Sequence, residues 1–232
     1  SITGQRGLSG AVAALDAQAY FFPHSHHQTR ENHVTLKYTG PSRHLAAILL
    51  GSLLIAAPAM SGPLLDAAIE AEKLAAQNDA RGAFEAIRSG LAAFSQSLPL
   101  TVPRAIFVTE VPKAYRAYTP KAEPVFLSGE KLITYVEVTG LKWQAADSKQ
   151  RQSHFTVDLE LTDDEGKTLA LQKEFGNFTF TAHSDAVEVY THLTLDVTGA
   201  KPGGYVLRYT VNDVIAERST PFELPFTLKE KS

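Results

Sequence analysis

The chain has 232 residues, 44% of them hydrophobic and 20% charged, which is typical of globular proteins and excludes disorder along the whole length. Its net charge of −3 argues against a nucleic-acid partner, which would need a clustered basic surface. The absence of cysteine excludes disulfides, thiolate metal sites and a catalytic thiol, so stability must come from apolar burial.

Residues 1–44 show no sustained hydrophobic period and contain no methionine. We expect this segment to be a leader or a non-native upstream sequence that is disordered and carries no packed core. It holds a histidine cluster whose short spacing would suit zinc, copper or nickel, but its place before an export signal favours a simple polar tract. The cluster consists of His24, His26, His27 and His33. No metal site is predicted.

Residues 45–59 are expected to be a signal peptide. Arg43 precedes a run of apolar and small residues that ends at Pro58, and Ala57 and Ala59 provide the small residues of a cleavage site. The run is shorter than the roughly 18 apolar residues that a membrane-spanning helix needs. A buried core helix is the alternative. The signal predicts a periplasmic or secreted protein without a stable membrane anchor after cleavage.

Residues 62–98 are expected to form a helical hairpin. Two runs of apolar residues keep helical spacing and are separated by a break at Asn78 and Asp79, with Ser61 and Pro63 available at the start of the first helix. The pattern resembles one tetratricopeptide-type unit. Because a single unit cannot bury its own apolar face, we expect the hairpin to dock onto something.

Residues 99–124 contain five prolines and are expected to form an extended strap, with a short first strand at residues 105–109. Tyr115, Arg116 and Tyr118 alternate aromatic and cationic side chains within it. Such a segment is a candidate ligand-binding site, because it could stack on sugars or hold an acidic partner. The alternative is a strap whose tyrosine rings pack on the protein while its cations stay in solvent.

Residues 125–232 alternate apolar and polar residues, which predicts antiparallel strands. The turn at residues 163–166 lacks the spacing of a calcium loop and is expected to be an acidic hairpin turn. The two prolines of the last segment suit only an edge strand. With the strand near Phe107 the count is about seven, and the other expected strands are residues 131–138, 155–162, 168–175, 187–197, 205–211 and 222–228.

The sequence from Pro202 through Gly203 and Gly204 to Tyr205 resembles the turn before the sixth strand of immunoglobulin- and fibronectin-like domains. The resemblance implies that Tyr205 folds back on the backbone as a tyrosine corner and that Trp143 packs between the sheets, although the paired cysteines of the family are missing. The predicted fold class is mainly β with a small α part: an immunoglobulin-like antiparallel β-sandwich preceded by a two-helix hairpin.

The combination of hairpin, strap and Pro-Gly-Gly-Tyr turn is similar to exported bacterial proteins that carry a helical hairpin before such a sandwich. This resemblance implies fold and export, and it implies no activity.

The chain contains no nucleophile elbow, phosphate-binding loop or zinc-protease motif. His154, His192, Asp158 and Glu188 fall on the polar phase of their strands and are expected to form a solvated face. We therefore expect a non-enzymatic interaction module without a cofactor, whose partner is a protein or a polysaccharide. The alternatives are a carbohydrate-binding accessory domain that uses the strap aromatics and a metal-dependent hydrolase on the outer sheet face.

The export signal predicts that the mature chain begins at Met60, because cleavage after Ala59 satisfies the small-residue rule. N-terminal sequencing of exported material measures the start. Retention of residues before His44, together with their protection from protease, would contradict the signal.

Overall fold

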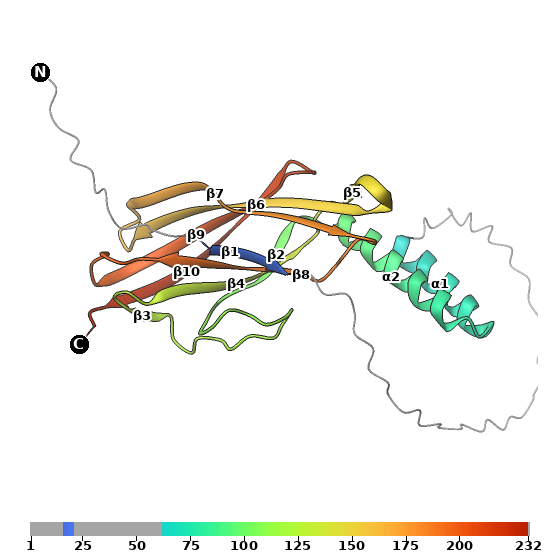
Figure 1. Ribbon diagram of the computed structural model, residues 1–232, viewed down its shortest axis with the longest axis horizontal. Helices are drawn as coiled ribbons and strands as arrows, with labels where there is room; N and C mark the ends of the chain where they lie inside the picture. Colours follow the sequence, from blue (N-terminus) through green and yellow to red (C-terminus); the bar gives the residue numbers. More distant parts are fainter. Residues whose placement is uncertain (1–15, 21–61, 232) are drawn as a thin grey trace, which may run out of the picture. The chain divides into compact units, whose positions relative to one another are not determined.

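The computed structural model describes residues 16–20 and 62–231 (Figure 1). The expected signal peptide, residues 45–59, lies outside the described residues, as does most of the expected leader, residues 1–44. The histidine cluster of the leader lies outside them as well.

Two antiparallel helices form the hairpin that the sequence predicts: α1 (Pro63–Ala76) and α2 (Ala80–Ser97). α1 starts after Gly62 with Pro63 in its first turn, where a missing N–H costs no hydrogen bond. The expected cap Ser61 lies outside the described residues. α2 starts at Asp79, whose carboxylate accepts the N–H of Gly82 at 2.9 Å. The helical part of the predicted fold class is confirmed.

The rest of the described chain is mainly β, as predicted, and forms two sheets (Figure 1). The first sheet has the order β1-β8-β4-β2, and the second has the order β3-β10-β9-β6, with β5 and β7 both paired to β6. The strand pairs are antiparallel except for β3 with β10, so the second sheet is mixed. The strands are β1 (Asp16–Tyr20), β2 (Thr101–Val108), β3 (Val125–Leu127), β4 (Lys131–Thr139), β5 (Gln144–Ala145), β6 (Arg151–Asp163), β7 (Thr168–Ala182), β8 (Val189–Asp196), β9 (Gly203–Asp213) and β10 (Arg218–Lys229).

β1 lies within the segment for which no packed structure was expected. It pairs antiparallel with β8, from Asp16 opposite Thr194 to Tyr20 opposite Tyr190. The five residues carry no strong strand pattern of their own, so the edge of β8 provides the template for this pairing.

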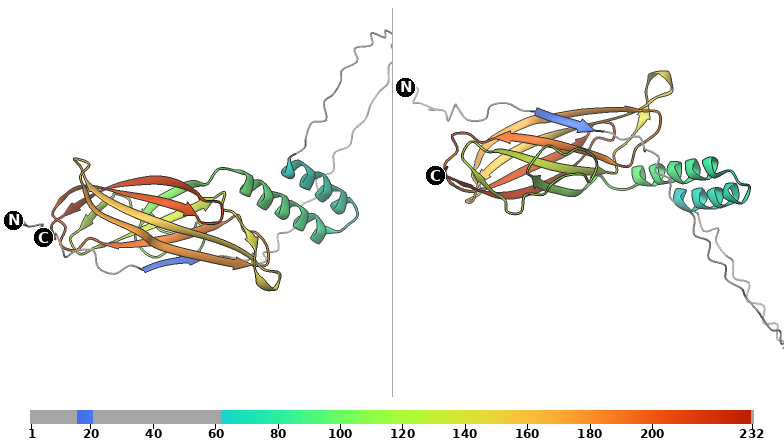
Figure 2. Two further views of the ribbon diagram at one scale, coloured as in Figure 1. Left: turned by 90° about the horizontal axis from the view of Figure 1, so that it is seen from above. Right: turned by 60° about the horizontal axis from the view of Figure 1, so that its bottom comes forward.

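The two sheets face each other (Figure 2). Buried side chains from both sheets form one hydrophobic core. Phe107 from the first sheet contacts Phe126 and Phe226 from the second, with ring centroids 5.0 and 6.1 Å apart in edge-to-face geometry. Trp143, expected between the sheets, is buried in the same cluster. This apolar contact between the sheets stabilises a chain that can form no disulfide.

Strand β10 is paired along its length with β9, and on its other side β3 covers only Thr227–Lys229. Pro221 and Pro225 lie before the part that β3 covers. The two prolines therefore lie on an open edge of the sheet, where their missing N–H groups leave no strand partner unpaired. The end of β10 lies between β9 and β3 and is not at an edge.

A buried carboxylate organises the turns at one end of the sheets. Asp213, the last residue of β9, is 1% exposed. It accepts the backbone N–H groups of Lys142, Ile215 and Ala216 at 2.9 to 3.2 Å. These bonds satisfy donors that the turns after β4 and β9 would otherwise leave without a strand partner.

Arg218 joins this carboxylate to the end of the helical hairpin. It pairs with Asp213 at 3.3 Å and donates to the carbonyl groups of Leu98 and Gly140. Leu98 follows α2 and Gly140 follows β4, so one guanidinium links the hairpin, the first sheet and the second sheet.

Tyr205 has the corner geometry that the sequence predicts. Its hydroxyl donates to the carbonyl of Lys201 at 2.5 Å, the side chain is 8% exposed, and its ring stacks on Phe226 at 5.3 Å. Gly203 and Gly204 begin β9, and a Cβ on Gly204 would lie 3.3 Å from the Cβ of Asp164. The glycine therefore lets β9 run close to the turn at residues 163–166.

Replacing Tyr205 by Phe should lower the free energy of unfolding by about 1 kcal/mol, because the Lys201 carbonyl loses its donor while the ring packing remains. Urea denaturation measures the change. Tyr118→Phe is the control, since its hydroxyl has no part in the corner. Equal midpoints for Tyr205→Phe and the parent protein would show that the corner contributes nothing.

Candidate functional site

The two helices of the hairpin approach each other through small side chains. A Cβ on Gly90 of α2 would stand 2.1 Å from the Cβ of Ala67 on α1, so only glycine fits there. Ala71 is the buried residue of α1. Small residues let two helix backbones come close, but they leave no room for large side chains between the helices.

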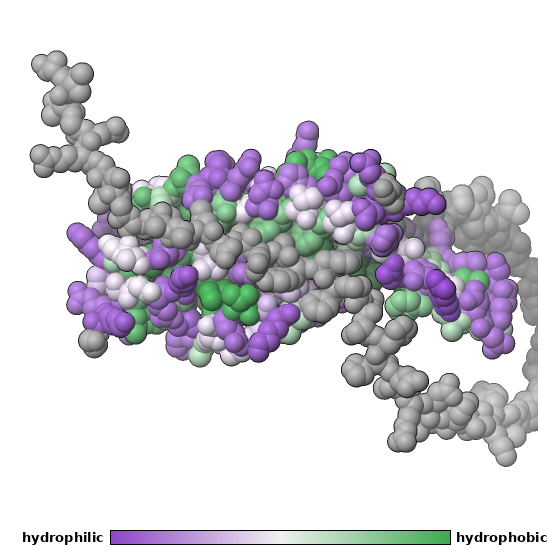
Figure 3. All heavy atoms as spheres, in the orientation of Figure 1, coloured by the Kyte–Doolittle hydropathy of each residue, from purple (hydrophilic) through white to green (hydrophobic). Residues whose placement is uncertain are grey.

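The large apolar side chains of the hairpin therefore reach solvent, and seven of them are between 37% and 58% exposed. We call these seven residues the hairpin apolar face: Leu64, Leu65, Ile69, Phe84, Ile87, Leu91 and Phe94. In Figure 3, hydrophobic atoms appear at the hairpin surface among hydrophilic ones. The other large hydrophobic residues that are this exposed are scattered over the strap, the strands and the turns. Among the described residues, large exposed apolar side chains are thus concentrated on the hairpin.

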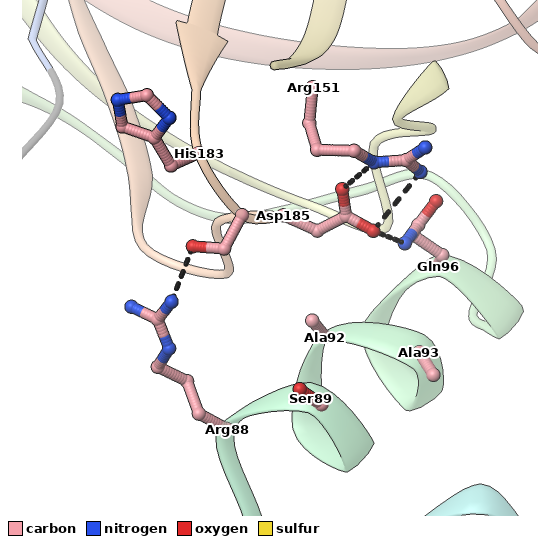
Figure 4. A pocket seen from close by; sticks show the side chains of 9 residues that line it. Arg88, Ser89, Ala92, Ala93, Gln96, Arg151, His183 and Asp185 are labelled. Atoms are coloured by element: carbon pink, nitrogen blue, oxygen red, sulfur yellow. Dashed lines mark hydrogen bonds and ion pairs between the residues drawn. The ribbon is translucent and has the colours of Figure 1, made fainter. Parts of the chain in front are cut away.

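α2 uses a different side to contact the sheets. Its buried residue Ala92 lies beside a hollow of about 260 Å³ (Figure 4). The hollow is lined by Arg88, Ser89, Ala92, Ala93, Gln96, Arg151, His183, Ser184 and Asp185. Helix and sheets thus meet through polar contacts, and the hairpin docks without covering its apolar face.

The polar groups of this hollow are engaged with one another. Arg151 grips the carboxylate of Asp185 at 2.6 and 3.3 Å, and Gln96 donates to the same carboxylate at 2.7 Å. Arg88 donates to the hydroxyl of Ser184 at 2.6 Å, as Figure 4 shows with a dashed line. The hydrogen bond that Arg151 donates to the Asp185 carboxylate raises the pKa of the guanidinium. We interpret the hollow as a junction between α2 and the sheets.

The strap loop, residues 109–121, covers the outer face of the first sheet. The ring of Tyr118 lies 4.3 Å from that of Tyr135, and the ring of Tyr115 lies 6.2 Å from that of Tyr190. Tyr115 and Tyr118 thus turn toward the sheet, and Arg116 remains exposed. The structure brings these three predicted ligand-binding residues together, with the two tyrosine rings packed against the first sheet and Arg116 exposed.

Glu137 anchors this cover and was missed in the sequence. It is 1% exposed and accepts hydrogen bonds from the hydroxyls of Tyr115 and Tyr135 at 3.3 and 3.1 Å. Arg116 lies 3.4 Å and Arg104 3.9 Å from its carboxylate. One feature of the sequence could have identified Glu137: it is a single acidic residue inside the apolar run of β4. A carboxylate that is buried in such a run requires hydrogen-bond donors or cations as partners.

Burial and the charge of Glu137 raise the pKa of both tyrosine hydroxyls, at Tyr115 and Tyr135. Both hydroxyls therefore stay protonated and donate to the carboxylate across the neutral range. The backbone N–H of Arg116 in turn donates to the Tyr135 hydroxyl at 3.0 Å. The cluster is a closed network that fixes the strap loop.

The expectation of a solvated face is wrong for His192. This residue is 2% exposed and lies on β8, which pairs with β1 on one side and with β4 on the other. His154 lies on β6 in the second sheet, where its ring contacts the side-chain oxygen of Asn177 at 2.9 Å. The two histidines belong to different sheets and form no common site.

Asp158 is also buried, again against expectation, whereas Glu188 is exposed as expected. A bulge in the β6–β7 pairing turns the N–H of Glu174 toward the Asp158 carboxylate, and Lys173 pairs with it at 2.8 Å. Burial acts to raise the pKa of Asp158, but these hydrogen bonds hold it below its usual value. The Asp158 carboxylate thus stabilises the bulge by accepting these hydrogen bonds.

Among residues 16–20 and 62–231, no group of three His, Cys, Asp or Glu side chains is placed to hold a metal ion. None of the helices in these two segments is long and apolar enough to cross a lipid bilayer.

The sequence matches no protein-family model and no curated protein. Among solved structures, a family 123 glycoside hydrolase from Clostridium perfringens is 13% identical over 57% of this chain and 28% of its own, with a TM-score of 0.35. An alkylpurine DNA glycosylase from Pseudomonas fluorescens is 12% identical over 67% of this chain and 40% of its own, with a TM-score of 0.32. The chain spans less than half of either protein, and similarities this low identify no function.

Replacing Glu137 by Ala should destabilise the protein by about 1 to 3 kcal/mol, because it leaves two buried hydroxyls without their acceptor. It should also speed trypsin cleavage in the strap loop, at Lys113 or Arg116. Urea denaturation and timed proteolysis measure the two effects. The matched control is Glu123→Ala, an exposed acidic residue just beyond the loop. Equal cleavage rates in the two variants would show that Glu137 does not hold the loop.

Proposed function

We propose that the chain is a non-enzymatic interaction module and that its binding surface is the hairpin apolar face. The observation that carries the proposal is the gathering of seven large, exposed apolar side chains on two packed helices. Contact of such a surface with water is unfavourable, and a partner that covers it removes this cost.

The state of the polar clusters supports a role without catalysis. The carboxylates of Glu137, Asp158 and Asp213 are each held by hydrogen bonds or ion pairs that fix a loop, a bulge or a turn. A general acid, base or nucleophile must instead face a space that a substrate can enter.

We propose a protein partner in preference to a polysaccharide. Sugar binding needs aromatic faces that are open to solvent. The rings of Tyr115 and Tyr118 pack on Tyr190 and Tyr135, so the strap offers little of this surface.

We also propose that the protein is exported and that its sheets follow an immunoglobulin-like arrangement. The signal-like run before Ala59 supports export to the periplasm or the exterior. Two sheets with a shared core and the Tyr205 corner support the immunoglobulin-like arrangement, although the parallel β3–β10 pair makes the second sheet mixed.

In dilute solution the apolar face should bind 8-anilinonaphthalene-1-sulfonate, a dye that fluoresces on apolar surfaces. Replacing Ile87 and Leu91 together by Glu should reduce the fluorescence severalfold, because two charges interrupt the face. Leu171→Glu is the control, since Leu171 is apolar and even more exposed than Ile87 and Leu91 but lies on β7. Fluorescence that is the same for all three proteins, with unchanged circular dichroism, would refute the proposed binding surface.

A further inference from the structure

We infer that the partner of the hairpin apolar face is a second copy of this chain, and that two hairpins pack face to face as a four-helix bundle with two-fold symmetry. This inference rests on the function proposed for that face. Two helices alone cannot enclose a core, whereas two such pairs bury their apolar faces against each other.

The spacing on α2 suits helix-to-helix packing. Phe84, Ile87, Leu91 and Phe94 follow one another at intervals of three, four and three residues, which is the seam pattern of paired helices. The small residues between α1 and α2 leave this seam outside the hairpin. It is therefore available to a helix from another molecule.

The charges of the two helices are complementary under two-fold symmetry. α1 carries three acidic residues and one lysine, a net charge of −2, and α2 carries two arginines and one glutamate, a net charge of +1. A two-fold axis parallel to the helices places α1 of each copy beside α2 of the other, in antiparallel orientation. Each acidic helix then meets a basic one, and the helix dipoles oppose each other favourably.

Part of this charge is already paired within each helix. Lys73 pairs with Glu70 at 3.2 Å, and Arg88 pairs with Glu85 at 3.3 Å. Glu72 and Arg81 are exposed and stand outside these pairs. They are the residues through which the two copies attract each other across the bundle.

Sedimentation equilibrium of the full chain tests the inference. The parent protein should show twice the monomer mass of 25.2 kDa, with a dissociation that follows mass action. Ile87→Glu should weaken the dimer at least about tenfold, since it places a charge in the buried seam. Leu171→Glu should leave the dimer unchanged. Circular dichroism of both variants establishes that they fold.

Charge reversal tests the two-fold arrangement itself. Glu72→Arg and Arg81→Glu should each weaken the dimer by about two- to fivefold, and the double variant should restore it. A non-specific apolar association would show no such restoration, and that result would overturn the arrangement.

The dye experiment separates failure of this inference from failure of the proposed function. A chain that stays monomeric at high concentration while its apolar face still binds the dye overturns the second copy as partner and leaves the binding surface intact. A monomer without face-dependent dye binding overturns both. Dimerisation together with dye fluorescence per chain that falls as concentration rises supports both.

Discussion

The ion pair between Asp213 and Arg218 is the contact on which the arrangement of the described chain depends. The carboxylate satisfies backbone donors of two turns, and the guanidinium reaches the carbonyl after α2 and the one after β4. Because both groups are multiply bonded, neither can move without freeing buried polar atoms. The hairpin, the first sheet and the second sheet are thereby held at one point, and the apolar core fills the space between the sheets.

The sequence predicts the parts of this fold that depend on local periodicity. Helical spacing locates the hairpin, alternation locates most strands, and Pro202 to Tyr205 predicts the corner. It does not predict the burial of His192, because β8 is an internal strand between β1 and β4 and local alternation does not reveal what lies over its faces. Burial of Asp158 likewise depends on a bulge in its partner strand. Both errors arise from assuming that the polar face of a strand meets water.

For the candidate site, too, the sequence predicts one part and not the other. The apolar pattern of the hairpin predicts that it docks onto something, but it does not predict which side of α2 contacts the sheets. α2 meets the sheets through Arg88 and Gln96, and its large apolar residues stay outside. Polar side chains thus form the contacts between α2 and the rest of the described chain, while large apolar side chains of the hairpin remain exposed. The strap loop is held by polar side chains as well: Tyr115 and Arg116, which the sequence predicts to bind a ligand, contact Glu137.

The open edge of β10 has a consequence for pairing between sheets of different molecules. Pro221 and Pro225 are accommodated in the pairing with β9, so their nitrogens face away from it. Glu223 lies between them, and its carboxylate pairs with Arg208 of β9 at 2.7 Å. An incoming strand finds few N–H groups to pair with along this stretch. The open edge of β10 is thus protected against amyloid-like strand pairing along this stretch.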